Sequence, residues 1–266
     1  MTLFPQFRSS IAPPIARAEA ITSTIVALGS RYDAAPVFPV ESMKALVTAD
    51  LHRTFAPLES GGEAFDDAVA RNQCLMTVLR IIGRADLSVG RLYEGHVNAL
   101  AMFDWFGSPA QKADLGQKIA QGAFYGVWAT EPQPGVQLRQ SALDGRKSFA
   151  TGAGGLAYAV ITAQPEEGER RLVVIRADDP ARTDLSQWRV RGMRATGSGF
   201  YDLTGIAVDS SHLLGQPGDY DREPRFTTGA WRFTAVQLGG IEALLTEIRI
   251  AMSDAARADP LQRAKF

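Results

Sequence analysis

Apolar residues in the first 123 positions recur at spacings of three and four, which predicts amphipathic helices. Residues 14–29 carry one such stripe, and a shorter one begins at Glu41-Ser42. Residues 65–106 continue the pattern for long enough to form two helices, after a glycine-containing loop at 55–65. This part of the chain is predicted to be all α.

The clearest local signal lies in residues 107–122, GSPAQKADLGQKIAQG. Ser108 can cap a helix, Pro109 suits its first position, and Gln111 stands three residues after the cap. Gly122 is placed to end the same helix. We therefore expect a helix that begins with a capping box.

The period changes after residue 123, where short segments rich in β-branched and aromatic residues alternate with turns. These predicted strands are FYGVWAT (124–130), KSFAT (147–151), LAYAVITA (156–163), RLVVIRA (171–177) and GFYDLTGIAV (199–208). No helix-length insertion separates them, so an antiparallel or mixed sheet is expected rather than a series of parallel βαβ units.

The helical pattern returns at Thr228 and continues through one long amphipathic segment towards DPLQRAKF (259–266). An apolar helix face must be buried against something, so further helices are expected from another chain or from a longer form of this one. The predicted fold is α+β, with an N-terminal helical domain (1–123), a middle β-domain (124–225) and the first helix of an incomplete C-terminal helical domain (226–266).

Composition excludes several classes of function. The 28 basic residues are matched by 29 acidic ones, so no net positive charge favours nucleic-acid binding. A lone cysteine, Cys74, excludes an internal disulfide, and three histidines (His52, His96 and His212) in unrelated settings offer neither a metal site nor a hydrolase triad. Neither a signal peptide nor a membrane span is recognised, so a cytoplasmic protein is expected.

The segment GVWATEPQPGVQLR (126–139) is the main candidate for a binding site. After the predicted strand, Thr130 contributes a hydroxyl next to a row of main-chain N–H groups, while Pro132 and Pro134 stiffen the exit. Such a row can hydrogen-bond the edge of a flavin ring, although an ordinary turn is the favoured explanation when the segment is taken alone. Phe149 and Thr151 on a neighbouring strand offer an aromatic ring and a second hydroxyl, and taken alone this pair is better explained by ordinary sheet packing. GAGG at 152–155 is interpreted as a tight turn, because a strand follows it where a dinucleotide site needs a helix.

Four segments in this order resemble the acyl-CoA dehydrogenase family across nearly the whole chain. They are FGSPAQKADLGQKIAQGAFYGVWATEP, LDGRKSFATGA, GMRATGSGFYDLTGIAVDSSHLLGQPGDY and DPLQRAKF. The resemblance implies a helical domain, a β-domain and a C-terminal four-helix bundle that together hold FAD. It also implies an acyl-CoA substrate, a homo-oligomer (tetramer or dimer), electron-transferring flavoprotein as electron acceptor, and a role in fatty acid metabolism.

By this resemblance the flavin contacts are Val127, Trp128, Ala129, Thr130, Gly135, Val136, Phe149, Ala150 and Thr151. Arg263, in an Arg-x-x-Phe motif closed by Phe266, is expected to reach the cofactor of a neighbouring subunit. A guanidinium is a suitable bidentate partner for phosphate oxygens.

Several positions depart from the family pattern. Val136 replaces a serine that touches the flavin or substrate, and Phe149 replaces a tryptophan. Trp231-Arg232 occupies the region of an arginine that serves the CoA end. No catalytic residue is identified, because the family's glutamate is expected beyond residue 266. Glu242 and Glu247 do not fall at the matching turn, and Glu131 is expected to bridge within its loop.

The sequence therefore predicts an FAD-dependent acyl-CoA dehydrogenase-like oxidoreductase, in which a base removes a proton and the flavin takes a hydride. Two alternatives remain. One is a flavin-dependent monooxygenase of the same fold. The other is a non-catalytic partner subunit of a flavoprotein complex.

Overall fold

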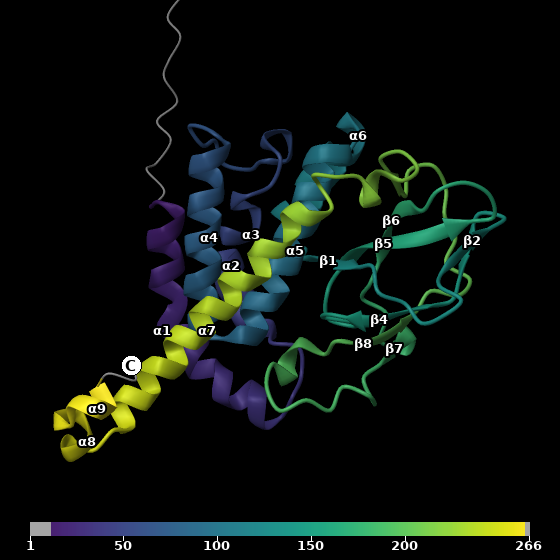
Figure 1. Cartoon of the computed structure of the whole chain (residues 1–266). Helices are drawn as coiled ribbons and strands as arrows, with labels where there is room; N and C mark the ends of the chain where they lie inside the picture. Colours follow the sequence, from purple (N-terminus) through teal and green to yellow (C-terminus); the bar gives the residue numbers. More distant parts are fainter. Residues whose placement is uncertain (1–11, 264–266) are drawn as a thin grey trace, which may run out of the picture.

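The computed structural model describes residues 12–263, in which a layer of helices packs beside a β-region (Figure 1). The predicted helices of the first half are all present, and Leu51–Thr54 adds a short one. In chain order the helices of this half are α1 (Pro14–Ala34), α2 (Val40–Thr48), α3 (Leu51–Thr54), α4 (Ala68–Ala85), α5 (Leu87–Phe106) and α6 (Pro109–Ala120).

Side-chain caps explain where these helices begin. The Ser108 hydroxyl accepts from Gln111 N–H while the Gln111 side chain accepts from Ser108 N–H, so the predicted capping box is confirmed. Asp86 separates α4 from α5: its N–H bonds to Ile82 O and its carboxylate accepts from Val89 N–H. One residue thus ends one helix and caps the next, which fixes where α5 starts.

The β-region contains a mixed six-stranded sheet and a three-stranded antiparallel sheet, as the α+β prediction requires. The first sheet comprises β1 (Tyr125–Trp128), β2 (Gln137–Arg139), β3 (Ala142–Asp144), β5 (Tyr158–Pro165), β6 (Arg171–Arg176) and β9 (Leu213–Leu214). The second comprises β4 (Arg146–Ala150), β7 (Thr183–Asp184) and β8 (Gly199–Asp202). In the first sheet β5 is central: β6 pairs with one edge antiparallel, and β1 and β2 pair with it in parallel.

His96 joins the helical layer to β1. Its Nδ1 accepts from Tyr125 N–H at 3.1 Å, so Nε2 carries the proton and donates to His52 O at 2.6 Å. Complete burial lowers the pKa of His96 to about 3, which keeps the ring neutral in this role. The expectation that His52 and His96 occupy unrelated settings is therefore wrong, because the fold places both rings beside Phe124.

Helix α7 (Ala230–Ala251) crosses α4 at very short range. A Cβ on Gly239 would lie 2.6 Å from Arg84 N, and a Cβ on Gly83 would lie 2.9 Å from Val236 Cα. Two glycines in facing helices thus let the backbones touch, and the Val236 side chain packs against Gly90 on α5. This crossing places the N-terminal half of α7 beside α5 and the β-region (Figure 1).

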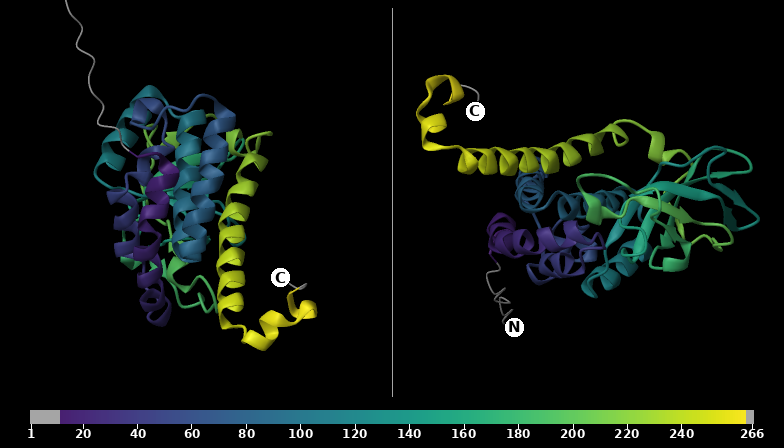
Figure 2. Two further views of the ribbon diagram at one scale, coloured as in Figure 1. Left: turned by 90° about the vertical axis from the view of Figure 1, so that its left-hand side faces the viewer. Right: turned by 90° about the horizontal axis from the view of Figure 1, so that it is seen from below.

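The C-terminal half of α7 extends past the other helices towards α8 (Asp254–Ala258) and α9 (Pro260–Arg263) (Figure 2). Its exposed side chains include Ile241, Leu244 and Ile250. No helix between residues 12 and 263 is both long and apolar enough to cross a membrane. The division into domains at residues 123 and 225 stays a prediction.

Candidate functional site

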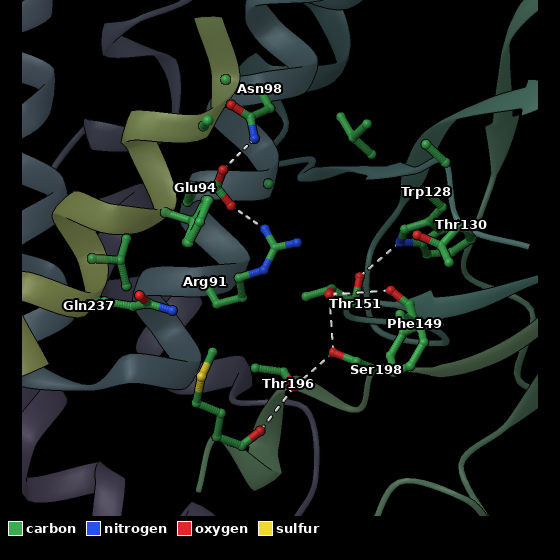
Figure 3. Close-up of a pocket in the computed structure, with 18 of the residues that line it drawn as sticks. Arg91, Glu94, Asn98, Trp128, Thr130, Phe149, Thr151, Thr196, Ser198 and Gln237 are labelled. Atoms are coloured by element: carbon green, nitrogen blue, oxygen red, sulfur yellow. Dashed lines mark hydrogen bonds and ion pairs between the residues drawn. The ribbon is translucent and has the colours of Figure 1, made fainter. Parts of the chain in front are cut away.

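A pocket of about 690 Å³ lies where α5 and the start of α7 face the edge of the β-region (Figure 3). One wall consists of α5 residues, and the opposite wall consists of β1, the end of β4 and the loop before β8. Aromatic side chains of Trp188, Tyr220, Phe226 and Phe233 complete the lining. The site is thus assembled from segments more than 100 residues apart in the chain.

The edge of β1 offers backbone groups to the pocket. Tyr125 N–H donates to His96 on the side of β1 that faces away from β5. Backbone groups of successive strand residues point to opposite edges, so the N–H and C=O of Val127 point the same way as those of Tyr125. Val127 lines the pocket, which therefore has one hydrogen-bond donor and one acceptor available from main chain.

Phe149 projects into the pocket from a bulge in β4. The pairing of β4 with β8 shifts between Lys147 and Ala150, and Phe149 takes a left-handed backbone conformation with φ of 52°. Its ring remains 65% exposed, an unusual state for a large apolar side chain. Backbone strain at an exposed aromatic residue in a pocket is typical of a ligand-binding position.

We expect Phe149→Gly to be more stable than Phe149→Ala by about 0.5–1 kcal/mol, because only glycine adopts this φ without a Cβ clash. Both variants lack the ring, so their difference isolates the backbone strain. Urea unfolding of the two variants measures it. Equal midpoints, or a more stable alanine variant, would show that the bulge is unstrained.

Three buried hydroxyls form a row along the floor of the pocket (Figure 3). Thr151 Oγ1 lies 3.0 Å from Ser198 Oγ, which lies 2.9 Å from Thr196 Oγ1. Thr196 then donates to Met193 O at 2.9 Å. Trp128 closes this floor from the core side, since its Nε1 donates to Thr151 O at 3.0 Å.

The α5 wall is charged. Glu94 is only 2% exposed, and its two carboxylate oxygens accept from Arg91 and from the Asn98 amide. The Asn98 oxygen in turn accepts from Arg232 Nη1 at 2.9 Å. Burial lowers the pKa of Arg232, and its Nε has no hydrogen-bond partner among the described residues. One carboxylate thus balances two guanidinium groups beside the pocket.

A buried ion pair fixes the segment that follows β1. Lys147 is fully buried, and its ammonium contacts the Glu131 carboxylate and donates to Thr162 Oγ1 at 2.8 Å. On the same side Ser148 N–H donates to Thr130 O at 2.9 Å. These contacts attach the Thr-Glu-Pro segment to β4, so Glu131 does bridge within the site region instead of facing the pocket.

The structure brings most of the proposed flavin contacts together. The six that line the pocket are Val127, Trp128, Ala129, Thr130, Phe149 and Thr151. Gly135, Val136 and Ala150 do not line it, and the side chains of Val136 and Ala150 are completely buried in the core. Val136 stands in place of the family's serine at a position that is completely buried in the core. An apolar side chain suits this position, because a buried hydroxyl needs a hydrogen-bond partner.

Three further residues considered from the sequence lie away from this pocket. Arg263 ends α9, at the far end of α7 from the β-region, and Phe266 lies outside the described residues (Figure 2). Glu242 pairs with Arg80 on α4, and Glu247 is exposed. Neither glutamate reaches the pocket.

Sequence reasoning missed the polar residues Arg91, Glu94, Asn98 and Gln237, along with the hydroxyls of Thr196 and Ser198. A charged Arg-x-x-Glu pair within an otherwise apolar helix was the available signal for the first two. Among the described residues, no cluster of three or more His, Cys, Asp or Glu side chains could hold a metal ion. The arrangement suits a planar ligand with polar edges and an apolar face.

Comparison with known proteins assigns the fold. Residues 17–123 match the family model "Acyl-CoA dehydrogenase, N-terminal domain". Among solved structures, TdsC from Paenibacillus sp. A11-2 in complex with FMN and indole superposes with a TM-score of 0.79 at 22% identity, covering 93% of this chain and 69% of that one. Butyryl-CoA dehydrogenase from Megasphaera elsdenii gives a TM-score of 0.75 at 15% identity, covering 92% of this chain and 69% of that one.

Sequence relatives include YdbM from Bacillus subtilis, named as an acyl-CoA dehydrogenase and 27% identical over 190 residues, and enzymes named for another activity. Dibenzothiophene monooxygenase from Rhodococcus erythropolis is 26% identical over 247 residues, which cover 83% of this chain and 57% of that enzyme. The enzyme of the same name from Mycolicibacterium goodii is 28% identical over 200 residues, covering 66% of this chain and 45% of that one. This chain therefore spans about half the length of the curated relatives it matches. The resemblance to the acyl-CoA dehydrogenase family is confirmed, both by its N-terminal domain and by its architecture.

Proposed function

We propose that this chain, which has the acyl-CoA dehydrogenase fold, is the flavin-binding part of a flavin-dependent monooxygenase. The observation that carries the proposal is the convergence on one pocket of the β1 edge, the exposed Phe149 ring and the Thr151 hydroxyl. An isoalloxazine ring needs an apolar face and hydrogen-bonding groups at its edges, and this donor set fits it. FMN is bound by TdsC, and FAD is the cofactor expected by family resemblance, so both are candidates.

The alternative of acyl-CoA dehydrogenation needs a base that removes a proton next to the thioester carbonyl. Among the described residues that line the pocket, Glu94 is the only carboxylate. Both of its oxygens already accept hydrogen bonds from Arg91 and Asn98, so it is poorly placed to take a proton from substrate, and the family resemblance expects the base of a dehydrogenase beyond residue 266. The preference for oxygenation rests on the dibenzothiophene monooxygenase of Rhodococcus erythropolis, whose match covers 83% of this chain, against 66% for the acyl-CoA dehydrogenase-like YdbM of Bacillus subtilis.

Bound reduced flavin would supply the two electrons that split O₂, one oxygen atom entering the substrate and the other leaving as water. The residues of this chain would orient the ring, through the Val127 backbone and Thr151, and would hold the substrate. In this scheme O₂ accepts the electrons, so electron-transferring flavoprotein is not required. The reductant is a separate donor that delivers reduced flavin.

The pocket lining supports an aromatic substrate. Trp188, Phe226 and Phe233 line the pocket with aromatic rings, and such rings stack on flat apolar molecules. TdsC binds indole, so we propose an aromatic heterocycle of that kind as the substrate class. An oligomer in which Arg263 reaches a neighbouring cofactor remains part of the proposal.

We expect the purified chain to bind FMN or FAD and, with chemically reduced flavin and O₂, to insert one ¹⁸O atom from ¹⁸O₂ into indole or dibenzothiophene. Flavin fluorescence measures the first step and mass spectrometry the second. Phe149→Ala should weaken flavin binding, whereas Phe65→Leu, which is remote from the pocket, should not. Anaerobic bleaching of bound flavin by an acyl-CoA would instead support the dehydrogenase. A protein that leaves excess flavin unbound would support the non-catalytic partner subunit.

A further inference from the structure

The row of hydroxyls from Thr151 to Thr196 has a defined direction. All three side chains are buried, with exposures of 8% for Thr151, 7% for Ser198 and 1% for Thr196. Water therefore has little access to them, and their hydrogen bonds must be made within the protein or to a ligand in the pocket. The row ends at Met193 O, a carbonyl that can only accept.

Counting protons orients every bond in the row. Each hydroxyl has one proton, and three hydrogen bonds need one each. Thr196 must use its proton on Met193 O, so the proton between Thr196 and Ser198 belongs to Ser198. The proton between Ser198 and Thr151 then belongs to Thr151. With all three bonds formed, Thr151 has no proton left for the pocket.

The second protein contact of Thr151 leads to the same result. Its Oγ1 lies 3.5 Å from Phe149 O, which can only accept. Whether the Thr151 proton points to Ser198 or to Phe149, the hydroxyl faces the pocket with its lone pairs. A ligand atom at this position is stabilised if it carries an N–H and is repelled if it is a bare acceptor.

We infer that Ser198 and Thr196 make Thr151 a hydrogen-bond acceptor, and that the pocket therefore binds reduced flavin more tightly than oxidised flavin. This inference rests on the proposed function. In this proposal the central ring of the flavin lies at Thr151. Two-electron reduction gives that ring an N–H, whereas the oxidised ring presents a bare nitrogen. Ser198 and Thr196 are thus positioning residues, which select the redox state of the cofactor through Thr151.

The test compares dissociation constants of oxidised FMN and of dithionite-reduced FMN under anaerobic conditions, with FAD in parallel. For the unaltered chain we expect the reduced form to bind about tenfold more tightly. A tenfold preference equals an increase of about 30 mV in the two-electron midpoint potential of the bound flavin, which provides an independent readout.

Thr196→Val is the decisive variant, because it preserves shape and removes the acceptor of the Ser198 proton. Ser198 can then donate to Thr151, whose own proton keeps only Phe149 O, at the long distance of 3.5 Å, as a protein acceptor and can turn into the pocket, so the preference should fall or reverse. Ser198→Ala should reduce it. Thr246→Val, on the exposed part of α7, removes a hydroxyl that bonds only Glu242 O and should leave the tenfold preference unchanged.

The outcomes separate the two proposals. If neither redox form of either flavin binds, the proposed function and this inference are both wrong. If both forms bind with equal affinity, or if Thr196→Val retains the full preference, flavin binding stands and the inference about the hydroxyl row is wrong.

Discussion

Glu131→Gln is expected to lower the free energy of unfolding by about 3–5 kcal/mol, since it leaves the fully buried Lys147 ammonium without a counter-charge. The remaining bond to Thr162 Oγ1 cannot replace a carboxylate. Urea or thermal unfolding measures the loss. Because the same ion pair attaches Thr130 and its neighbours to β4, the variant should also bind flavin less tightly.

Two control variants separate burial from bonding. Lys147→Met should cost less than Glu131→Gln, because the Glu131 side chain keeps 18% of its surface exposed and can be solvated. The double variant Glu131→Gln/Lys147→Met should recover most of the unfolding free energy lost in Glu131→Gln, because replacing both members of a buried ion pair by neutral groups is often tolerated. A Glu131→Gln variant with unchanged stability would show that the pair contributes nothing.

The pH dependence of the Glu131→Gln variant provides a further check. Burial lowers the pKa of Lys147 from 10.5 to about 7 in the unaltered chain, and loss of the Glu131 carboxylate should lower it further. Between about pH 7 and pH 10.5 Lys147 is protonated in the unfolded chain and largely neutral in the folded one. The unfolded chain therefore binds more protons, so the free energy of unfolding should rise with pH in this range. A flat profile from pH 7 upwards would contradict the assignment.

Gly239→Leu is expected to be the most damaging substitution outside the pocket, with a loss of about 2–3 kcal/mol or more. Its side chain would collide with the backbone of Arg80 and Arg84, which cannot move aside without shifting α4. Helix α7 would then separate from α4 and displace Phe233 and Gln237 from the pocket wall. Unfolding experiments measure the loss, and flavin titration measures the effect on the pocket.

The comparison variant is Gly95→Ala, another glycine within a helix, which lines the pocket and therefore serves as a control for stability and not for flavin binding. A Cβ there meets nothing closer than Arg91 Nη1 at 3.8 Å, so the substitution should stabilise the chain by up to about 1 kcal/mol through helix propensity. If Gly239→Leu behaved like Gly95→Ala, the close crossing of α4 and α7 would be wrong.

Local signals in the sequence were sufficient for most of the fold. The capping box at Ser108 and the strands containing Val127 and Val173 depend on neighbours within a few residues, and all are present. Strands β2 and β3 were missed because three residues such as Gln137–Arg139 are too few to show an alternating pattern. The crossing at Gly83 and Gly239 depends on two helices meeting in space, which no local pattern reports.

Site residues that belong to a recognisable sequence motif could be predicted. Site residues that only the tertiary structure brings together could not. Thr130 and Thr151 belong to recognisable segments, and both line the pocket. Ser198 was assigned only to a turn, because its partner Thr151 lies 47 residues away. The left-handed backbone of Phe149 was equally invisible, since nothing in KSFAT requires a bulge.

The pairing of β5 with two strands at one edge has a consequence for variation within this fold. The segment between Trp128 and Gln137 leaves the sheet and returns to it beside the same strand, so both of its ends are fixed by β5. Residues can be exchanged or inserted between these two anchors without changing the register of either strand. The part of this segment that lines the pocket, at Ala129 and Thr130, could therefore diverge among descendants of one ancestor and take up new chemistry, while the sheet beneath it stayed the same.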